Sequence, residues 1–227
     1  MNTGSQDLAA LRETASRVLI ALLWLHVPIA MAIGMARGAD WAIPTLLMTA
    51  FAAAATLSWR AAGNGVSTSL LVAVALMGGV SIFAFQLSGH PWQIDMHMYF
   101  FAALACTVAY CDIRPILAGT VAVALHHLAL NFILPAAIFP GGSEFGRVVL
   151  HAGILILEAG VLVWVAHQLA TLFMMTAQKT AEAEAAGIAE ARATAQRGEA
   201  EQRARLERDA AMRGLATEFE NKIGHIV

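Results

Sequence analysis

The sequence predicts an all-α membrane protein, in which a six-helix transmembrane bundle continues into a cytoplasmic dimeric coiled coil. Of its 227 residues, 59% are hydrophobic and only 13% are charged, and the mean hydropathy is +0.65. Soluble domains carry about 25% charged residues. Residues 176–227 hold 8 of the 14 Lys and Arg and 9 of the 16 Asp and Glu, so a polar tail follows an apolar body. This composition excludes a soluble enzyme and a disordered chain, and the net charge of -2 argues against a nucleic-acid partner.

Six apolar stretches reach or approach the length of about 20 residues that crosses a bilayer. They cover residues 17–36, 41–59, 68–88, 95–111, 115–136 and 147–175. Turn-forming residues separate them, such as Gly63-Asn64-Gly65. We therefore expect a cytoplasmic N-terminal segment over 1–16, a transmembrane domain over 17–175 and a cytoplasmic helix over 176–227.

Six spans place both termini on the same side of the membrane, and the basic residues indicate which side. Four of them fall on the side of the termini and two fall on the opposite side: Arg12, Arg17, Arg60 and Arg114 against Arg37 and Arg147. Because short cytoplasmic segments are enriched in Lys and Arg, this distribution favours cytoplasmic termini.

The tail has the composition of a helix that pairs with a second helix. After Lys179, Ala, Glu, Arg and Gln dominate and no proline occurs. Near its end, apolar residues follow the 4-3-4-3 spacing of a coiled coil, at Met212, Ala216, Phe219, Ile223 and Ile226. Such a seam buries its apolar side only against a partner, so we expect a parallel homodimer. Because the seam still runs where the sequence stops, we expect the sequence to be truncated within the coil.

Two regions resemble bacterial methyl-accepting chemotaxis proteins. Residues 215–227 (LATEFENKIGHIV) resemble the start of the cytoplasmic signalling hairpin of that family. Residues 95–164 resemble the six-helix membrane region that precedes the hairpin in some of its members. The matching pieces are DMHMYFF (95–101), DIRP (112–115), HHLALNF (126–132), FPGG (139–142) and the pair His151 and Glu158.

The resemblance implies a chemoreceptor rather than an enzyme, held in the bacterial inner membrane with cytoplasmic termini. It also implies that a chemotaxis kinase and its adaptor bind the part of the receptor beyond the truncated coil. The sequence lacks two parts that are common in the family, a large periplasmic ligand domain and a clear HAMP module. Sensing is therefore expected within the membrane helices themselves, with the signal passing along the sixth helix.

Ionisable residues inside membrane helices are costly, and each one is a candidate for function. With a rise of about 1.5 Å per residue, His97, His127, Asn131 and His151 fall at similar depths near the outer ends of three consecutive helices. Glu158 lies two turns below His151 on the same helix face. His126 and His127 point about 100° apart, and the Asn131 one turn away favours His127 as the inward residue.

Three neutral imidazoles and a carboxylate at one depth are suited to a transition metal ion such as copper, zinc or iron. We therefore predict His97, His127, His151 and Glu158 as metal ligands. Hydrogen bonds from Asp95, Tyr99 and Asn131 are expected to orient these ligands. A b-type haem is the alternative, bound by two of the four histidines His97, His126, His127 and His151, with Asn131 beside it. Each histidine could also simply hydrogen-bond between helices.

Three function classes are open at this point. The first is a receptor whose membrane helices bind a metal ion, a haem or a small ligand. The second is an intramembrane zinc-dependent hydrolase with Glu158 as the general base. The third is a b-type cytochrome. The long charged helix favours the receptor, because neither of the other two classes needs a coil that continues from the membrane.

Overall fold

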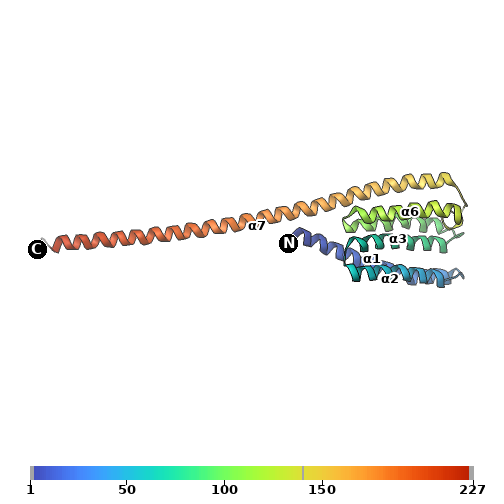
Figure 1. Cartoon of the computed structure of the whole chain (residues 1–227), viewed down its shortest axis with the longest axis horizontal. Helices are drawn as coiled ribbons and strands as arrows, with labels where there is room; N and C mark the ends of the chain where they lie inside the picture. Colours follow the sequence, from blue (N-terminus) through green and yellow to red (C-terminus); the bar gives the residue numbers. More distant parts are fainter. Residues whose placement is uncertain (1–2, 140, 225–227) are drawn as a thin grey trace. The chain divides into compact units, whose positions relative to one another are not determined.

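A computed structural model describes residues 3–139 and 141–224 and confirms the all-α class, because no strand occurs among these residues. The chain divides into two compact units, one ending at Thr176 and the other beginning at Ala177. The helical segments (Figure 1) are α1 (Thr3–Ala36), α2 (Ala42–Ala62), α3 (Val66–Gln86), α4 (Gln93–His97), α5 (Tyr99–Cys106), η1 (Thr107–Tyr110), α6 (Ile113–Ile133), η2 (Pro135–Ala137) and α7 (Phe145–Gly224).

Five of these helices are long and apolar enough to cross a membrane, namely α1, α2, α3, α6 and α7. The apolar stretches of the sequence thus form several helices of membrane-spanning length, as a multi-pass membrane protein requires. Residues 3–16, expected as a segment outside the membrane, are helical and form the first part of α1.

The expected fourth span over residues 95–111 is helical but interrupted, because it consists of α4, α5 and η1 instead of one continuous helix. The chain tightens at Met98, whose N–H bonds the carbonyl of Asp95, while the N–H of Phe101 bonds the carbonyl of Met98. These bonds span three residues instead of four, as in a 3₁₀-helix, and they separate α4 from α5. The segment ends with η1 and with Cys111 in the left-handed region at φ 47°.

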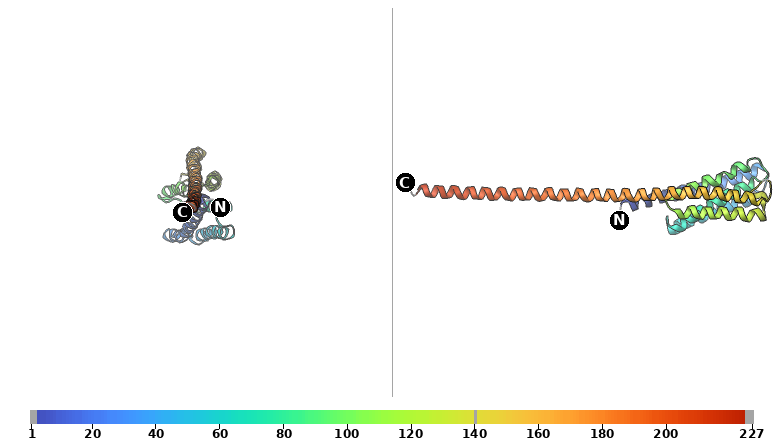
Figure 2. Two further views of the ribbon diagram at one scale, coloured as in Figure 1. Left: turned by 90° about the vertical axis from the view of Figure 1, so that its left-hand side faces the viewer. Right: turned by 90° about the horizontal axis from the view of Figure 1, so that it is seen from above.

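The first unit is built around α3, which packs against α1, α2, α5 and α6. Figure 2 (left) shows its helices end-on, with α1 and α2 on one side and the first part of α7 on the other. Two adjacent glycines in α3 allow close packing. A Cβ on Gly78 would lie 2.5 Å from the Phe51 ring, and one on Gly79 would lie 2.9 Å from Nδ1 of His26. Larger residues at either position would push these rings away.

The part of α7 in the first unit has two different faces. One face is buried against the other helices, at Val148, Leu155, Ala159 and Ala166. The opposite face is exposed and carries three glycines seven residues apart, at 146, 153 and 160, and a Cβ added to any of them would meet no other atom within 4 Å. None of the extensive helix–helix contacts of this unit involves α7, so α7 packs less tightly than α3.

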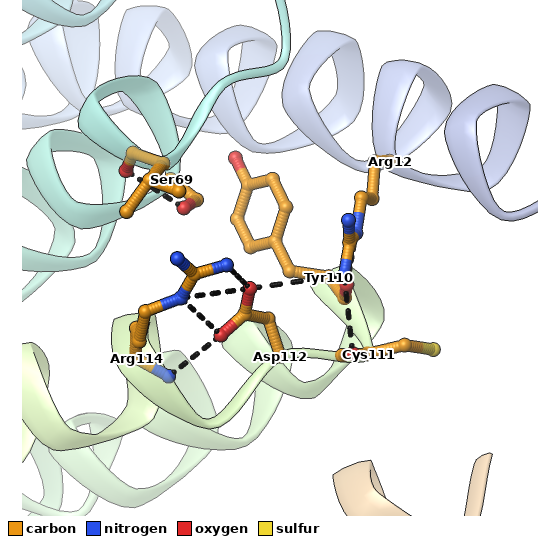
Figure 3. Close-up of polar contacts among 7 residues, drawn as sticks. Arg12, Ser69, Tyr110, Cys111, Asp112 and Arg114 are labelled. Carbon is orange, nitrogen blue, oxygen red and sulfur yellow. Dashed lines mark hydrogen bonds and ion pairs between the residues drawn. The ribbon is translucent and has the colours of Figure 1, made fainter. Parts of the chain in front are cut away.

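A polar cluster ties α1 to the start of α6 (Figure 3). Nε of Arg12 donates to the carbonyl of Tyr110 at 2.9 Å, and its guanidinium lies 3.7 Å from the carboxylate of Asp112. Asp112 caps α6 by accepting the N–H of Arg114 at 2.9 Å, and it also pairs with the Arg114 guanidinium. Hydrogen bonding to Arg114 lowers the pKa of Asp112 below its ordinary value.

The second unit is the remainder of α7, from Ala177 to Gly224. Its described side chains from Gln178 onward are exposed, including Met212 and Leu215 at 65% and 63%. The described side chains of the expected seam, Met212 and Ala216, are therefore exposed within one chain. The side chains of Phe219 and Ile223, and the whole of Ile226, lie outside the described residues.

Candidate functional site

Three histidines from three helical segments meet in the first unit, as their predicted depths require. His97 ends α4, His127 lies in α6 and His151 lies in α7. Their ring centres are 4.9 Å (His97–His127), 5.4 Å (His97–His151) and 5.8 Å (His127–His151) apart. The Nε2 atoms of His97 and His127 are 2.9 Å apart. We call these three residues the histidine triangle.

Backbone carbonyls define the orientation of two members of the histidine triangle. Nδ1 of His127 lies 2.9 Å from the carbonyl of Val123, and Nδ1 of His151 lies 2.8 Å from the carbonyl of Arg147. A carbonyl only accepts hydrogen bonds, so both Nδ1 atoms carry the proton and both Nε2 atoms keep a lone pair. His97 must then donate its Nε2–H to His127, and its buried Nδ1 has no hydrogen-bond partner among the described residues.

An apolar cavity of about 270 Å³ opens beside the histidine triangle, between α5, α6 and α7. All three histidines line it together with Phe100, Leu155 and Glu158. Oε2 of Glu158 is buried and has no hydrogen-bond partner among the described residues. The structure thus places the carboxylate in the same cavity as the imidazoles, as the sequence predicts.

A second cavity, of about 730 Å³, also reaches the histidine triangle. His97 and His151 line this cavity too, but His127 does not. Its wall is mostly apolar, with the ring of Phe139, and includes the polar side chains of Gln93 and Arg147. Two rings of the histidine triangle therefore line both cavities.

Aromatic rings enclose the histidine triangle, and the sequence analysis did not assign them. The ring centre of Phe100 lies 5.3 Å from that of His97 and 5.4 Å from that of His127. The ring of Phe139 lies 5.4 Å from that of His151, under the guanidinium of Arg147. Phe139 belongs to the FPGG piece, so the position of that motif beside a turn was the available signal.

Asn131 holds the loop that precedes α7. It is fully buried, and its Oδ1 accepts the N–H of Glu144 at 3.0 Å. Its amide nitrogen has no partner among the described residues. Asn131, one turn along α6 from His127, therefore anchors the backbone just before α7, the helix that carries His151.

The other predicted site residues have their hydrogen-bond partners or pockets elsewhere. His126 hydrogen-bonds with Ser81 of α3 through Nε2, and its ring also touches the histidine triangle, with its Nδ1 3.4 Å from Nδ1 of His127. Tyr99 pairs its hydroxyl with Nε2 of His26 at 2.7 Å. Asp95 lines the same pocket as His26 and Tyr99, and none of the three lines the two cavities beside the histidine triangle.

The chemistry of the histidine triangle suits a metal ion, although its atoms are arranged for hydrogen bonding. His127 and His151 each carry an Nε2 lone pair, although that of His127 accepts the hydrogen bond from His97. A carbonyl fixes each of those two rings from behind, as is usual for metal-binding histidines. In the part of the chain that the structure describes, no three His, Cys, Asp or Glu side chains form a ready-made metal site. Binding would have to replace the hydrogen bond between His97 and His127.

We find no match to this chain among the models of protein families, the curated proteins or the solved structures.

Proposed function

We propose that the first unit is the sensor domain of a bacterial transmembrane chemoreceptor. It binds a transition metal ion (copper, zinc or iron), or alternatively a b-type haem, through intramembrane histidines. The observation that carries this proposal is the histidine triangle, which joins α4, α6 and α7 at one point beside a cavity. Ionisable residues inside membrane helices are costly, so a gathering of three histidines favours a function in binding.

The signal travels along α7. This helix carries His151 and Glu158 and is assigned without interruption from Phe145 to Gly224, with no proline inside it. Because α7 packs loosely against the other helices of its unit, a bound ion that pulls on His151 meets little resistance. A shift of about 1–2 Å is a common size for such helix switches. The chain thus acts as a transducer and not as an enzyme.

The receptor lies in the bacterial inner membrane, in contact with lipid, with both termini in the cytoplasm. Many large apolar side chains on the helices are exposed, among them Leu46, Ile133 and Leu157 at 69%, 76% and 70%. Only lipid or a partner chain could cover them. The signalling coil then meets the chemotaxis kinase and its adaptor on the cytoplasmic side.

The receptor is a parallel homodimer along α7. The exposed glycines 146, 153 and 160 are spaced by seven residues, and Ala216 of the predicted seam follows Gly146 by 70 residues, a multiple of seven. One heptad register therefore connects the glycine face with the seam. Glycines at a helix surface allow two membrane helices to approach closely, and the second copy supplies that neighbour.

The test of the proposed function measures the output of the helix. Spin labels at Ala195 in two copies of the chain should change their separation when the cofactor is added, and His151→Ala should abolish the change. His167→Ala is the matched control, because His167 is exposed on the same helix and lines neither cavity beside the histidine triangle, and it should keep the change. Identical distance distributions with and without cofactor would refute the receptor.

A further inference from the structure

We infer that the histidine triangle is a site for a single zinc-type metal ion, bound by Nε2 of His97, His127 and His151, and not a haem site. The inference deepens the proposed function by choosing between its two ligand classes. Its argument uses only the geometry and chemistry of the first unit, so it can hold even if no signal leaves that unit.

The spacing of the three rings matches a tetrahedral ion. Zinc–nitrogen bonds of about 2.0–2.1 Å at tetrahedral angles put the centres of any two imidazoles about 5.2 Å apart. The observed separations of 4.9, 5.4 and 5.8 Å lie close to this value on all three edges. A square-planar ion would give two short edges of about 4.5 Å and one long edge of about 6.4 Å, which are less similar to those observed.

Haem requires a different arrangement. Its two axial histidines lie on opposite sides of the iron, with nitrogens about 4 Å apart and ring centres about 6.4 Å apart. The Nε2 atoms of His97 and His127 are only 2.9 Å apart, and a tetrahedral ion needs about 3.3 Å.

Only one ring has to change its protonation. His127 and His151 already present Nε2 lone pairs, because their Nδ1–H groups donate to backbone carbonyls. The proton of His97 moves from Nε2 to Nδ1 when the ion replaces the His97–His127 hydrogen bond, so three neutral imidazoles face the ion. The carboxyl group of Glu158 lines the same cavity without a hydrogen-bond partner at Oε2 among the described residues, and a bound cation would favour its charged form.

Three histidines leave the fourth position of a tetrahedral ion open. The cavity beside the histidine triangle is lined mostly by apolar groups, including Phe100 and Leu155. The open position would therefore take water or one small exogenous ligand. Glu158 lies two turns along α7 from His151 and enters this space as a charge, not as a fourth protein ligand.

The test uses the full chain in detergent or nanodiscs, stripped with a chelator and then given Zn²⁺ or haemin in separate arms. We expect one zinc per chain, with X-ray absorption showing three histidine nitrogens at about 2.0 Å. His97→Ala, His127→Ala and His151→Ala should each lower zinc affinity about 100-fold or more. His167→Ala is the control and should bind as the parent does, because the exposed His167 lines neither cavity beside the histidine triangle. Circular dichroism and size-exclusion profiles should show that every variant is folded.

The outcomes separate this inference from the proposed function. A bis-histidine haem spectrum without stoichiometric zinc binding would overturn the inference and leave a haem receptor in place. Zinc binding that all three single variants retain would also overturn it, because the ion would then lie elsewhere. Zinc bound by the histidine triangle, with unchanged spin-label distances, would support the inference and refute the receptor.

Discussion

Asp112 shows how one side chain can join two helices. Its carboxylate caps α6, pairs with Arg114 of the same helix and faces Arg12 of α1. The carboxylate is 11% exposed, so solvent screens these interactions less than it screens a surface pair. One charged group at the start of α6 thus contacts α1, as Figure 3 shows.

Two substitutions of Asp112 should distinguish the stability that its helix cap contributes from the stability that its negative charge contributes. Asp112→Ala loses both and should destabilise the fold by about 1–2 kcal/mol. Asp112→Asn keeps a capping oxygen and loses only the charge, so its cost should be smaller. Thermal unfolding of the detergent-solubilised variants at neutral pH measures both effects. An Asn variant as unstable as the Ala variant would contradict the separate role of the cap.

The charge at Asp112 also predicts a pH dependence. Because the pKa of Asp112 is lowered in the folded state, its charge stabilises the fold above the ordinary pKa of about 4 and loses this effect as the pH falls through the folded value. The difference in unfolding temperature between the parent and Asp112→Asn should therefore shrink below about pH 4. A difference that is constant from pH 7 to pH 3 would show that the charge has no such role.

At the scale of elements, α7 combines a buried face with an exposed glycine face. The buried face includes Leu155 and Ala159, and the glycine face includes Gly153 and Gly160. Nothing in one chain approaches these glycines. Each glycine weakens the helix by about 1 kcal/mol relative to alanine. Close approach of a second membrane helix would offset this cost.

Filling the glycine face should weaken the dimer and spare the bundle. Gly160→Ile places a branched side chain where the second copy is expected. Val161→Ile is the control, because it puts the same side chain at the neighbouring exposed position and enlarges the residue there by only one methylene group. Light scattering in detergent should show about two chains for the parent and the Val161 variant, and a larger monomer fraction for Gly160→Ile. Equal dimer fractions in all three would contradict a glycine-mediated interface.

The elements predicted from the sequence differ in how well the structure reproduces them. Long apolar runs without breaks, such as 68–88, predict α3 well because burial and hydrogen bonding favour the same helix. The break at Met98 was not predictable, because no proline or glycine marks it and local i→i+3 bonding sets it. The meeting of His97, His127 and His151 followed from depth alone. The pairing of Tyr99 with His26 and the position of Asp95 in the same pocket depend on packing against α1, and they were not predictable.

At the scale of the whole molecule, the heptad register should matter more than the length of α7. One alanine inserted within residues 176–187 rotates every later residue by about 100° and should disrupt the output of a receptor that contains its full signalling region. Seven inserted residues restore the register and should preserve the output. The measurement is kinase activity with and without the metal ion. Equal outputs from both insertions would contradict a rotational register.

His97 and His151 line both cavities beside the histidine triangle, so this pair forms part of a shared partition. An occupant of the cavity next to Phe100 and Leu155 and an occupant of the cavity next to Gln93 and Arg147 would then contact the same two rings. If one occupant changed the affinity for the other, the effect would be reciprocal and equal in size, as linkage requires. Two molecules of different chemistry would thus act on α7 through one side chain, that of His151.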